Sequence, residues 1–278
     1  MNTPHLFHYA QGRFQWELTV TDEYLVIMPT QRRWNLIEKL APYYPEVFFS
    51  KPLEHTGLFR HFAELSGDPQ SILSFAEKHG VLLPSREVTA ARGPKTEENT
   101  SGSWPAEPLE RWRTEISKMR RAVEVWDLLR SDDIDNLAER FTIQEKGGVL
   151  TVAHVENPEE VVYFTRGEWV GIEGAAWRYL EHVINKRLEA YTHAVLEFDA
   201  GKGRMALRVT AKCLLGALWL QFAQGVEGFK EYRQCGECGT WYELTPDKNR
   251  TNKLYCSNAC KQKAYRRRRA ATSQQAEE

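Results

Sequence analysis

The chain has 278 residues, 42% hydrophobic and 27% charged, a composition ordinary for a globular protein that buries a core. This length fits one large domain or two of common size, and the net charge of -1 points to no class of partner. Residues 230–269 nevertheless hold eleven of the 37 Lys/Arg but only four of the 38 Asp/Glu, which predicts a nucleic-acid-binding end on an acidic body.

The first 85 residues are predicted to form an N-terminal α+β module. Residues 6–28 alternate roughly and are rich in aromatic and β-branched side chains, which favours short strands. Further on, Asp68 is a typical helix N-cap, Pro69 suits the first helical position, and Gly80 marks a stop. Residues 86–107 are poor in aliphatic side chains and rich in Gly, Pro, Thr and Glu, so we expect a linker or long loop there.

Residues 108–230 are predicted to form a mixed domain of helices and β-hairpins. Five apolar residues fall on one helical stripe, and such a stripe is more often core than a ligand pocket: Trp112, Ile116, Met119, Val123 and Trp126. A short helix should follow from residue 131 to about 140.

The second half of this domain should contain two hairpins, two helices and a buried cysteine. The hairpins are expected at residues 141–155 and 194–209, and a helix at 173–191. Residues 211–223 are apolar nearly all round, so they predict a central buried helix with Cys213 as a small core residue. The longest apolar run is too short to span a bilayer, which needs about 20 residues. The fold class expected is therefore α+β, a mixed helical and β-hairpin body.

Residues 231–269 carry the one motif with strong chemical meaning. Two cysteine pairs, one with two residues between its members and one with three, are separated by seventeen residues: Cys235, Cys238, Cys256 and Cys260. A knuckle can bring the first pair together, and the last pair lies on one face of a helix's first turn, which Ser257 or Asn258 would begin. Residues 241–244 are expected to form a hairpin with residues 254–255 that returns the chain to the metal.

Four thiolates favour one structural Zn²⁺ in a closed tetrahedral shell, which leaves no position for water or substrate. Disulfides and an iron–sulfur cluster are the alternatives. Residues 1–10 lack the pattern of a signal peptide, which predicts a cytoplasmic location. Disulfides are disfavoured in a cytoplasmic protein. An iron–sulfur cluster is disfavoured because its usual motifs are spaced differently.

A strongly basic helix should follow the last cysteine. Eight residues of this helix and of the preceding loop are the candidates for nucleic-acid contact: Arg250, Lys253, Lys261, Lys263, Arg266, Arg267, Arg268 and Arg269. A helix that is cationic all round lies against phosphates or projects as an arm. The alternative is a solvated basic end of the domain, with a disordered tail at residues 270–278.

The finger region resembles a treble-clef finger in the order of its elements: a knuckle, an aromatic hairpin, a Cys-Ser-x-x-Cys motif and a basic helix. It is similar to the C-terminal finger of the CGNR-type bacterial zinc-finger proteins, in which an aromatic-Cys-Ser motif precedes the last ligand. Here Tyr255, Cys256 and Ser257 match that motif, and Cys260 matches the last ligand. The Gly-Asn-Arg that names the family is replaced by Lys261, Gln262 and Lys263. The resemblance implies DNA binding in bacterial transcription regulation.

No motif in the sequence predicts an enzyme. The eight histidines are scattered, and neither a metalloprotease motif nor a P-loop is present. We expect a protein that binds nucleic acid, DNA more than RNA, with no membrane partner and a homodimer as an open option. The alternatives are an adaptor whose finger only stabilises the C-terminal region, and an enzyme with a pocket between residues 110 and 225.

Overall fold

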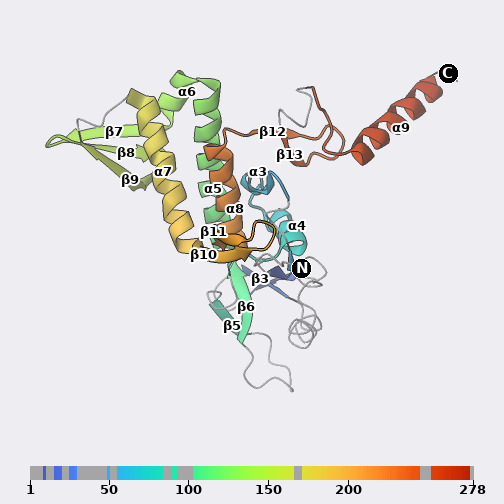
Figure 1. Cartoon of the computed structure of the whole chain (residues 1–278), viewed down its shortest axis with the longest axis horizontal. Coiled ribbons are helices and arrows are strands. Elements are labelled where there is room, and N and C mark those ends of the chain that lie inside the picture. Colours follow the sequence, from blue (N-terminus) through green and yellow to red (C-terminus); the bar gives the residue numbers. More distant parts are fainter. Residues whose placement is uncertain are drawn as a thin grey trace.

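The computed structural model describes nine segments of the chain: residues 9–10, 16–20, 25–29, 49–50, 55–83, 89–92, 103–165, 171–244 and 252–275. Their helices and small antiparallel sheets confirm the predicted α+β class (Figure 1). The helices gather into one body, and the finger with its long last helix projects from that body toward one side.

Residues near the N-terminus form short strands, as predicted. β1 (Tyr9–Ala10) pairs with β4 (Phe49–Ser50), while β2 (Trp16–Val20) and β3 (Leu25–Pro29) belong to a four-stranded sheet. The expected turns at Gly12 and at residues 21–22 lie outside the described residues.

The stretch predicted to be a linker supplies the other two strands of that sheet. These are β5 (Thr89–Arg92) and β6 (Ser103–Pro108), and the strand order is β2-β3-β6-β5. The prediction missed them because a β-ladder is made by backbone groups, which a composition rich in Gly, Pro and Glu does not record. At the end of β6, the Glu107 carboxylate is fully buried and accepts hydrogen bonds from the N–H groups of Leu82 and Leu83.

Two short helices precede this region. α3 (Leu58–Ala63) begins at Gly57 in the left-handed conformation, and α4 (Pro69–His79) begins at Asp68. The Asp68 carboxylate accepts hydrogen bonds from the N–H groups of Gln70 and Ser71, at 2.9 and 3.0 Å, which confirms the predicted cap.

One hydrophobic core joins these two helices to the rest of the body. It is built around three helices: α5 (Leu109–Ser131), α7 (Gly171–Tyr191) and α8 (Leu214–Glu227). The five residues of the predicted α5 stripe are all buried in it. Buried residues between 58 and 83 pack in this same core.

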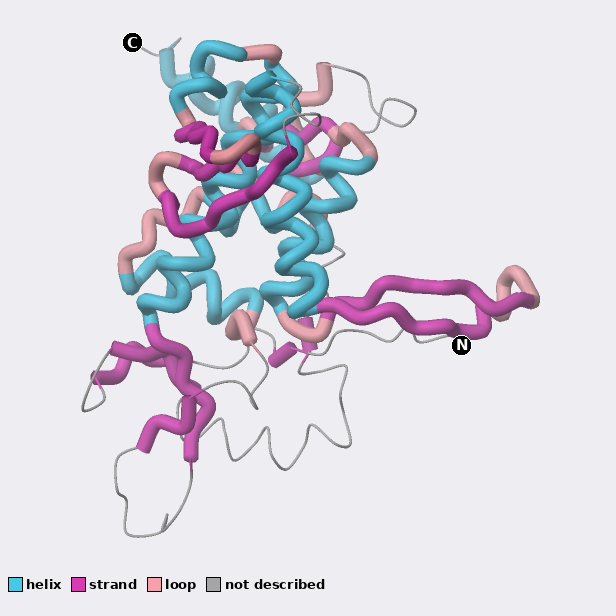
Figure 2. The backbone as a smooth tube through the Cα atoms, turned by 90° about the vertical axis from the view of Figure 1, so that its left-hand side faces the viewer, coloured by secondary structure: helices cyan, strands magenta, loops and turns pink. Residues whose placement is uncertain are grey.

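The body carries two β elements at its edges. β7 (Phe141–Lys146) and β8 (Val149–His154) form the predicted hairpin after the short helix α6 (Ile134–Glu139), and β9 (Asn157–Thr165) adds an unpredicted third strand. The second element is a two-stranded hairpin of β10 (Thr192–Asp199) and β11 (Arg204–Ala211). Figure 2 shows it as a long arm projecting from one end of the helices.

Cys213 lies just before α8, which begins three residues later than the predicted start at residue 211. It is buried, but it is the N-cap of α8, and its sulfur accepts the N–H of Gly216 at 3.4 Å. The prediction of a small buried side chain was correct, but the predicted start of the helix was not. Residue 213 has extended backbone, so the helix starts after it, although the apolar pattern begins earlier.

Candidate metal centre and basic helix

The four predicted cysteine ligands come together at the C-terminal end of the fold. Their sulfur atoms all lie within 4.8 Å of one another, and they are the one such cluster in the part of the chain that the structure describes. The Cys238 and Cys256 sulfurs are 3.7 Å apart, and those of Cys256 and Cys260 are 3.5 Å apart. A tetrahedron with metal–sulfur bonds of about 2.3 Å has sulfur–sulfur edges of roughly 3.8 Å. The cluster therefore has the size needed to hold a single metal ion.

The first pair lies on a tight knuckle between two strands, β12 (Glu231–Gln234) and β13 (Trp241–Leu244). The Cys235 carbonyl accepts the N–H of Gly239 at 2.9 Å, and the Cys235 N–H donates to Thr240 at 3.0 Å. Gly239 has a φ of 69°, a conformation that glycine adopts without strain. This closed turn directs both sulfurs toward one point.

The hairpin of the finger differs from the prediction. Residues 241–244 pair with β12, ahead of the knuckle, whereas residues 253–255 are not in a strand. The returning chain is held by single hydrogen bonds: Gly236 N–H to the Leu254 carbonyl at 3.0 Å, and Tyr242 Oη to the Lys253 carbonyl at 2.6 Å. The apolar pattern of residues 231–234 was too short to reveal the true partner strand.

The last pair is positioned by the start of the basic helix, α9 (Asn258–Gln275). The Ser257 hydroxyl accepts the Cys260 N–H at 3.2 Å, so Ser257 caps the helix as predicted. Cys256 lies before the helix and Cys260 in its first turn. Residues 270–275 continue α9, so the predicted disordered tail is wrong for them, because Ala, Ser and Gln can extend a helix already begun.

The thiols of the cluster lie close enough to shift one another's pKa values. Burial raises the pKa of Cys256, and the thiols of Cys260, Cys235 and Cys238 raise it further, to about 12. Burial also acts to raise the pKa of Cys235, but backbone N–H groups, including those of Cys256 and Glu237, outweigh it and lower that pKa to about 6. Four sulfurs this close repel one another as thiolates, so a bound cation is needed for all four to be ionised together.

Glu237, within the knuckle, connects the metal cluster to α9. Its side chain is only 2% exposed, and its carboxylate lies 3.2 Å from Arg267 and 3.6 Å from Lys263. Ala264, on the same side of the helix, is buried. Two of the predicted nucleic-acid contacts therefore also attach the helix to the finger, a role that their charge alone did not reveal.

The remaining basic residues of α9 are exposed and lie away from this attachment. At about 100° per residue, they occupy the flanks and the outer face of the helix: Lys261, Arg266, Arg268 and Arg269. Lys253 stacks its ammonium over the ring of Tyr242, 4.9 Å from the centroid, so it lies against the hairpin. Arg250 is outside the described residues.

The finger is joined to the helical body by contacts that the sequence did not predict. Glu64, at the end of α3, accepts hydrogen bonds from Trp241 Nε1 at 2.9 Å and from the Gln234 amide at 3.1 Å. The guanidinium of Arg60 lies 4.9 Å from the Trp241 ring and 5.4 Å from the Tyr232 ring. Sequence reasoning could not find these pairs, because the partners are far apart along the chain.

Comparisons with known proteins identify no family. No protein-family model matches the chain, and neither a curated protein nor a solved structure does. The resemblance of the finger to CGNR-type proteins therefore stays a prediction from its motif. Among the helices that the structure describes, none has the length and apolar character needed to cross a membrane.

Proposed function

We propose that the protein binds DNA through its C-terminal finger and acts in bacterial transcription regulation. The observation that carries the proposal is α9: six of its eighteen residues are Lys or Arg, none is Asp or Glu, and it projects from the body (Figure 1). All six basic side chains are exposed. Such a helix places a concentrated positive charge where a phosphate backbone can reach it.

Zn²⁺ is the ion that this donor set fits best. Four soft thiolates in a tetrahedral cluster match zinc, and a closed shell gives it a structural role. In this proposal the ion fixes Cys260, and with it the first turn of α9, relative to the knuckle. Glu237 adds a second attachment one and two turns further on, through Lys263 and Arg267. The helix would then be presented in a fixed direction.

The shape of the finger favours duplex DNA over duplex RNA. An α-helix with its side chains is about 10–12 Å across, and the major groove of B-DNA, about 12 Å wide, admits it. The major groove of A-form RNA is too deep and narrow for side chains to read. Lys261, Arg266, Arg268 and Arg269 would contact phosphates on both sides of the groove. Gln262, on the outer face, would be the residue placed nearest to base edges.

Salt-dependent binding tests the proposal directly. We would titrate the zinc-loaded protein against a duplex DNA at several salt concentrations, with a duplex RNA in parallel. The test variant changes four exposed residues to Ala and keeps the Glu237 attachment: Lys261, Arg266, Arg268 and Arg269. The matched control removes the same charge from exposed residues of the body: Lys78, Lys146, Arg178 and Lys186.

The wild type and the control should bind DNA with an affinity that falls steeply with salt. The test variant should bind more weakly on all sequences, and its log–log salt slope should shrink by up to about 0.9 per lost phosphate contact. A folded, metal-loaded wild type without salt-sensitive binding would reject the proposal and favour the adaptor alternative. Equal losses in the test variant and the control would show that net charge, and not α9, governs binding.

A further inference from the structure

The β10–β11 hairpin, here called the arm (residues 192–211), has one face made almost wholly of apolar side chains. Directly opposed residues in an antiparallel pair lie on the same face. The register opposes Leu196 to Leu207, Phe198 to Met205 and Ala194 to Val209. Five of these six side chains are large, and each is more than half exposed, Leu207 reaching 73%.

The other face of the arm is polar and ion-paired. Arg208 lies 3.4 Å from Glu197 and 3.3 Å from Asp199, and Lys202 lies 4.0 Å from Asp199. The polar face is therefore readily solvated, whereas the apolar face is not. Two-stranded hairpins alone are marginally stable in water, and the arm extends from the body with its apolar row uncovered by the residues that the structure describes (Figure 2).

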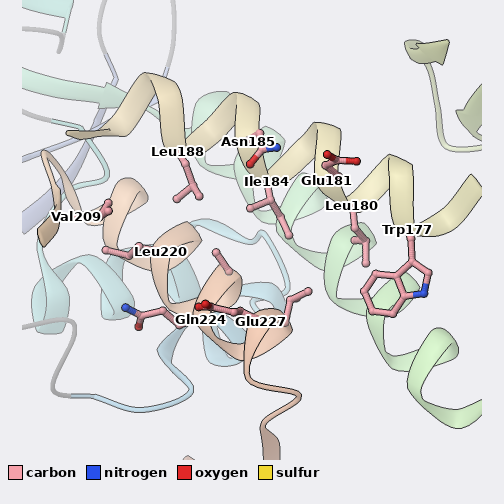
Figure 3. A pocket seen from close by; sticks show the side chains of 12 residues that line it. Trp177, Leu180, Glu181, Ile184, Asn185, Leu188, Val209, Leu220, Gln224 and Glu227 are labelled. Atoms are coloured by element: carbon pink, nitrogen blue, oxygen red, sulfur yellow. The ribbon is translucent and has the colours of Figure 1, made fainter. Parts of the chain in front are cut away.

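The apolar face continues into a groove between α7 and α8. The groove has a volume of about 520 Å³, and Val209 of the arm lines one end of it. Figure 3 shows Leu180, Ile184 and Leu188 of α7 directed toward α8 across the groove, with Trp177 at the end opposite to Val209. The apolar face of the arm therefore meets, at Val209, a groove with a largely apolar floor and polar side chains along its edges.

The exposed apolar area of this surface approaches the area that one partner buries in an interface between protein chains. Five large side chains more than half exposed present on the order of 500 Å², at the upper end of what monomers show. The groove adds to this, and a standard interface buries about 800 Å² on each partner.

The charges around the surface complement one another. Glu181 and Glu227 line the groove, whereas Lys202 and Arg204 lie at the tip of the arm. A surface with an acidic part and a basic part is self-complementary when a two-fold axis sets the tip of one arm against the groove of the other chain.

From these observations we infer that the protein is a homodimer, with the arm and groove of one copy covered by the same surface of a second copy. This inference does not depend on the proposed DNA binding. Three observations identify the partner as a second copy of this chain. They are the contact between arm and groove, the exposed apolar area and the complementary charges. The second copy would then cover the apolar face of the arm, which a single chain leaves exposed.

The test is the oligomeric state of the full-length, metal-loaded protein by sedimentation equilibrium. The disrupting variant is Leu196→Glu with Leu207→Lys, a directly opposed pair that keeps the hairpin paired by opposite charges but makes its apolar face polar. The control is His193→Glu with Thr210→Lys, an opposed pair of the same chemistry on the other face. Leu207→Ser is a milder second variant, and circular dichroism with metal content verifies folding.

The wild type and the control should sediment at twice the chain mass of 32.2 kDa at micromolar concentration. The dissociation constant of the Leu196→Glu, Leu207→Lys variant should rise at least 100-fold, and that of Leu207→Ser about tenfold. A monomeric wild type would overturn the inference. A folded double variant that remains dimeric would overturn it as well. If that dimeric variant also lost DNA binding, the arm would be assigned to nucleic-acid contact.

Discussion

Replacing Arg60 with Ala should destabilise the whole protein, although Arg60 is a charged residue on a short helix. Arg60 is 6% exposed, and its guanidinium donates two hydrogen bonds to the Asp127 carboxylate, at 2.7 and 2.8 Å. The same group lies 5.0 Å from the Trp126 ring and 4.9 Å from the Trp241 ring. One side chain thus joins α3, α5 and the finger.

The magnitude follows from these contacts. A bidentate charged pair contributes about 1.5–3 kcal/mol, and the value belongs near the lower end because the Asp127 side chain is 44% exposed. Stacking on rings adds about 1 kcal/mol for a largely desolvated cation, and the lost packing adds a similar amount. The expected cost of Arg60→Ala is therefore about 3.5 kcal/mol. Arg60→Lys should cost about half as much, because an ammonium keeps the charge but not the two-point contact.

Urea unfolding followed by tryptophan fluorescence measures this cost, and the melting temperature should fall by about 2–4 °C for each kcal/mol. The control is Arg178→Ala, which removes an ion pair of 2.9 Å to Glu181 in which both side chains are about half exposed. Exposed pairs contribute less than about 1 kcal/mol. If Arg60→Ala cost no more than Arg178→Ala, the view that Arg60 joins the finger to the body would be refuted.

Three further predictions concern the metal, the close packing of α8 and the response to acid. The protein should bind one zinc per chain, and Cys238→Ser should lose most of it by elemental analysis, because binding and folding of the finger are coupled; unchanged zinc would place the ion elsewhere. Gly216→Ala should lower the free energy of unfolding, measured by urea denaturation, by about 2–3 kcal/mol, since an added Cβ would lie 2.2 Å from the Tyr191 carbonyl oxygen; a stabilised variant would mean that the helices separate freely. Burial and Lys78 lower the pKa of His79 to about 3 from 6.5, so its neutral form stabilises the fold above pH 6.5 and this contribution is lost as the pH falls toward 3. At pH 4, His79→Phe should therefore reduce the acid-induced loss of unfolding free energy by about 3 kcal/mol. Urea denaturation of wild type and variant with equal pH dependence would contradict this prediction.

The features predicted correctly from the sequence were those encoded in a few neighbouring residues. The ligand cluster needed only the cysteine spacing, and the caps at Asp68 and Ser257 needed only the residue type and the start of an apolar or basic run. The α5 stripe was equally direct, because every member recurs at helical spacing on one element.

The features that were missed depend on partners distant in the chain. Strand β6 pairs with β3 through backbone groups, so the loop-like composition of residues 86–107 concealed it. The hairpin of the arm was predicted, but alternation of apolar residues normally means one buried face, and only the structure shows Leu207 exposed. Arg60 gave no signal at all, since its acidic partner is 67 residues away and its ring partners belong to three different elements.

The hydrogen bonds that return the chain to the knuckle have a consequence for metal uptake. The Lys253 carbonyl accepts from Tyr242 and from Arg233, and neither bond involves a sulfur. They keep the segment before Cys256 close to the other half of the cluster before any ion arrives, so the ion does not have to close the intervening loop by itself. The second pair of ligands then acts at a high effective concentration toward an ion held by the first. Because Glu64 in turn holds the hairpin that carries these bonds, the affinity for metal becomes a property of the entire folded chain. A peptide limited to residues 231–275 should lose its ion to a chelator more readily than the intact protein does.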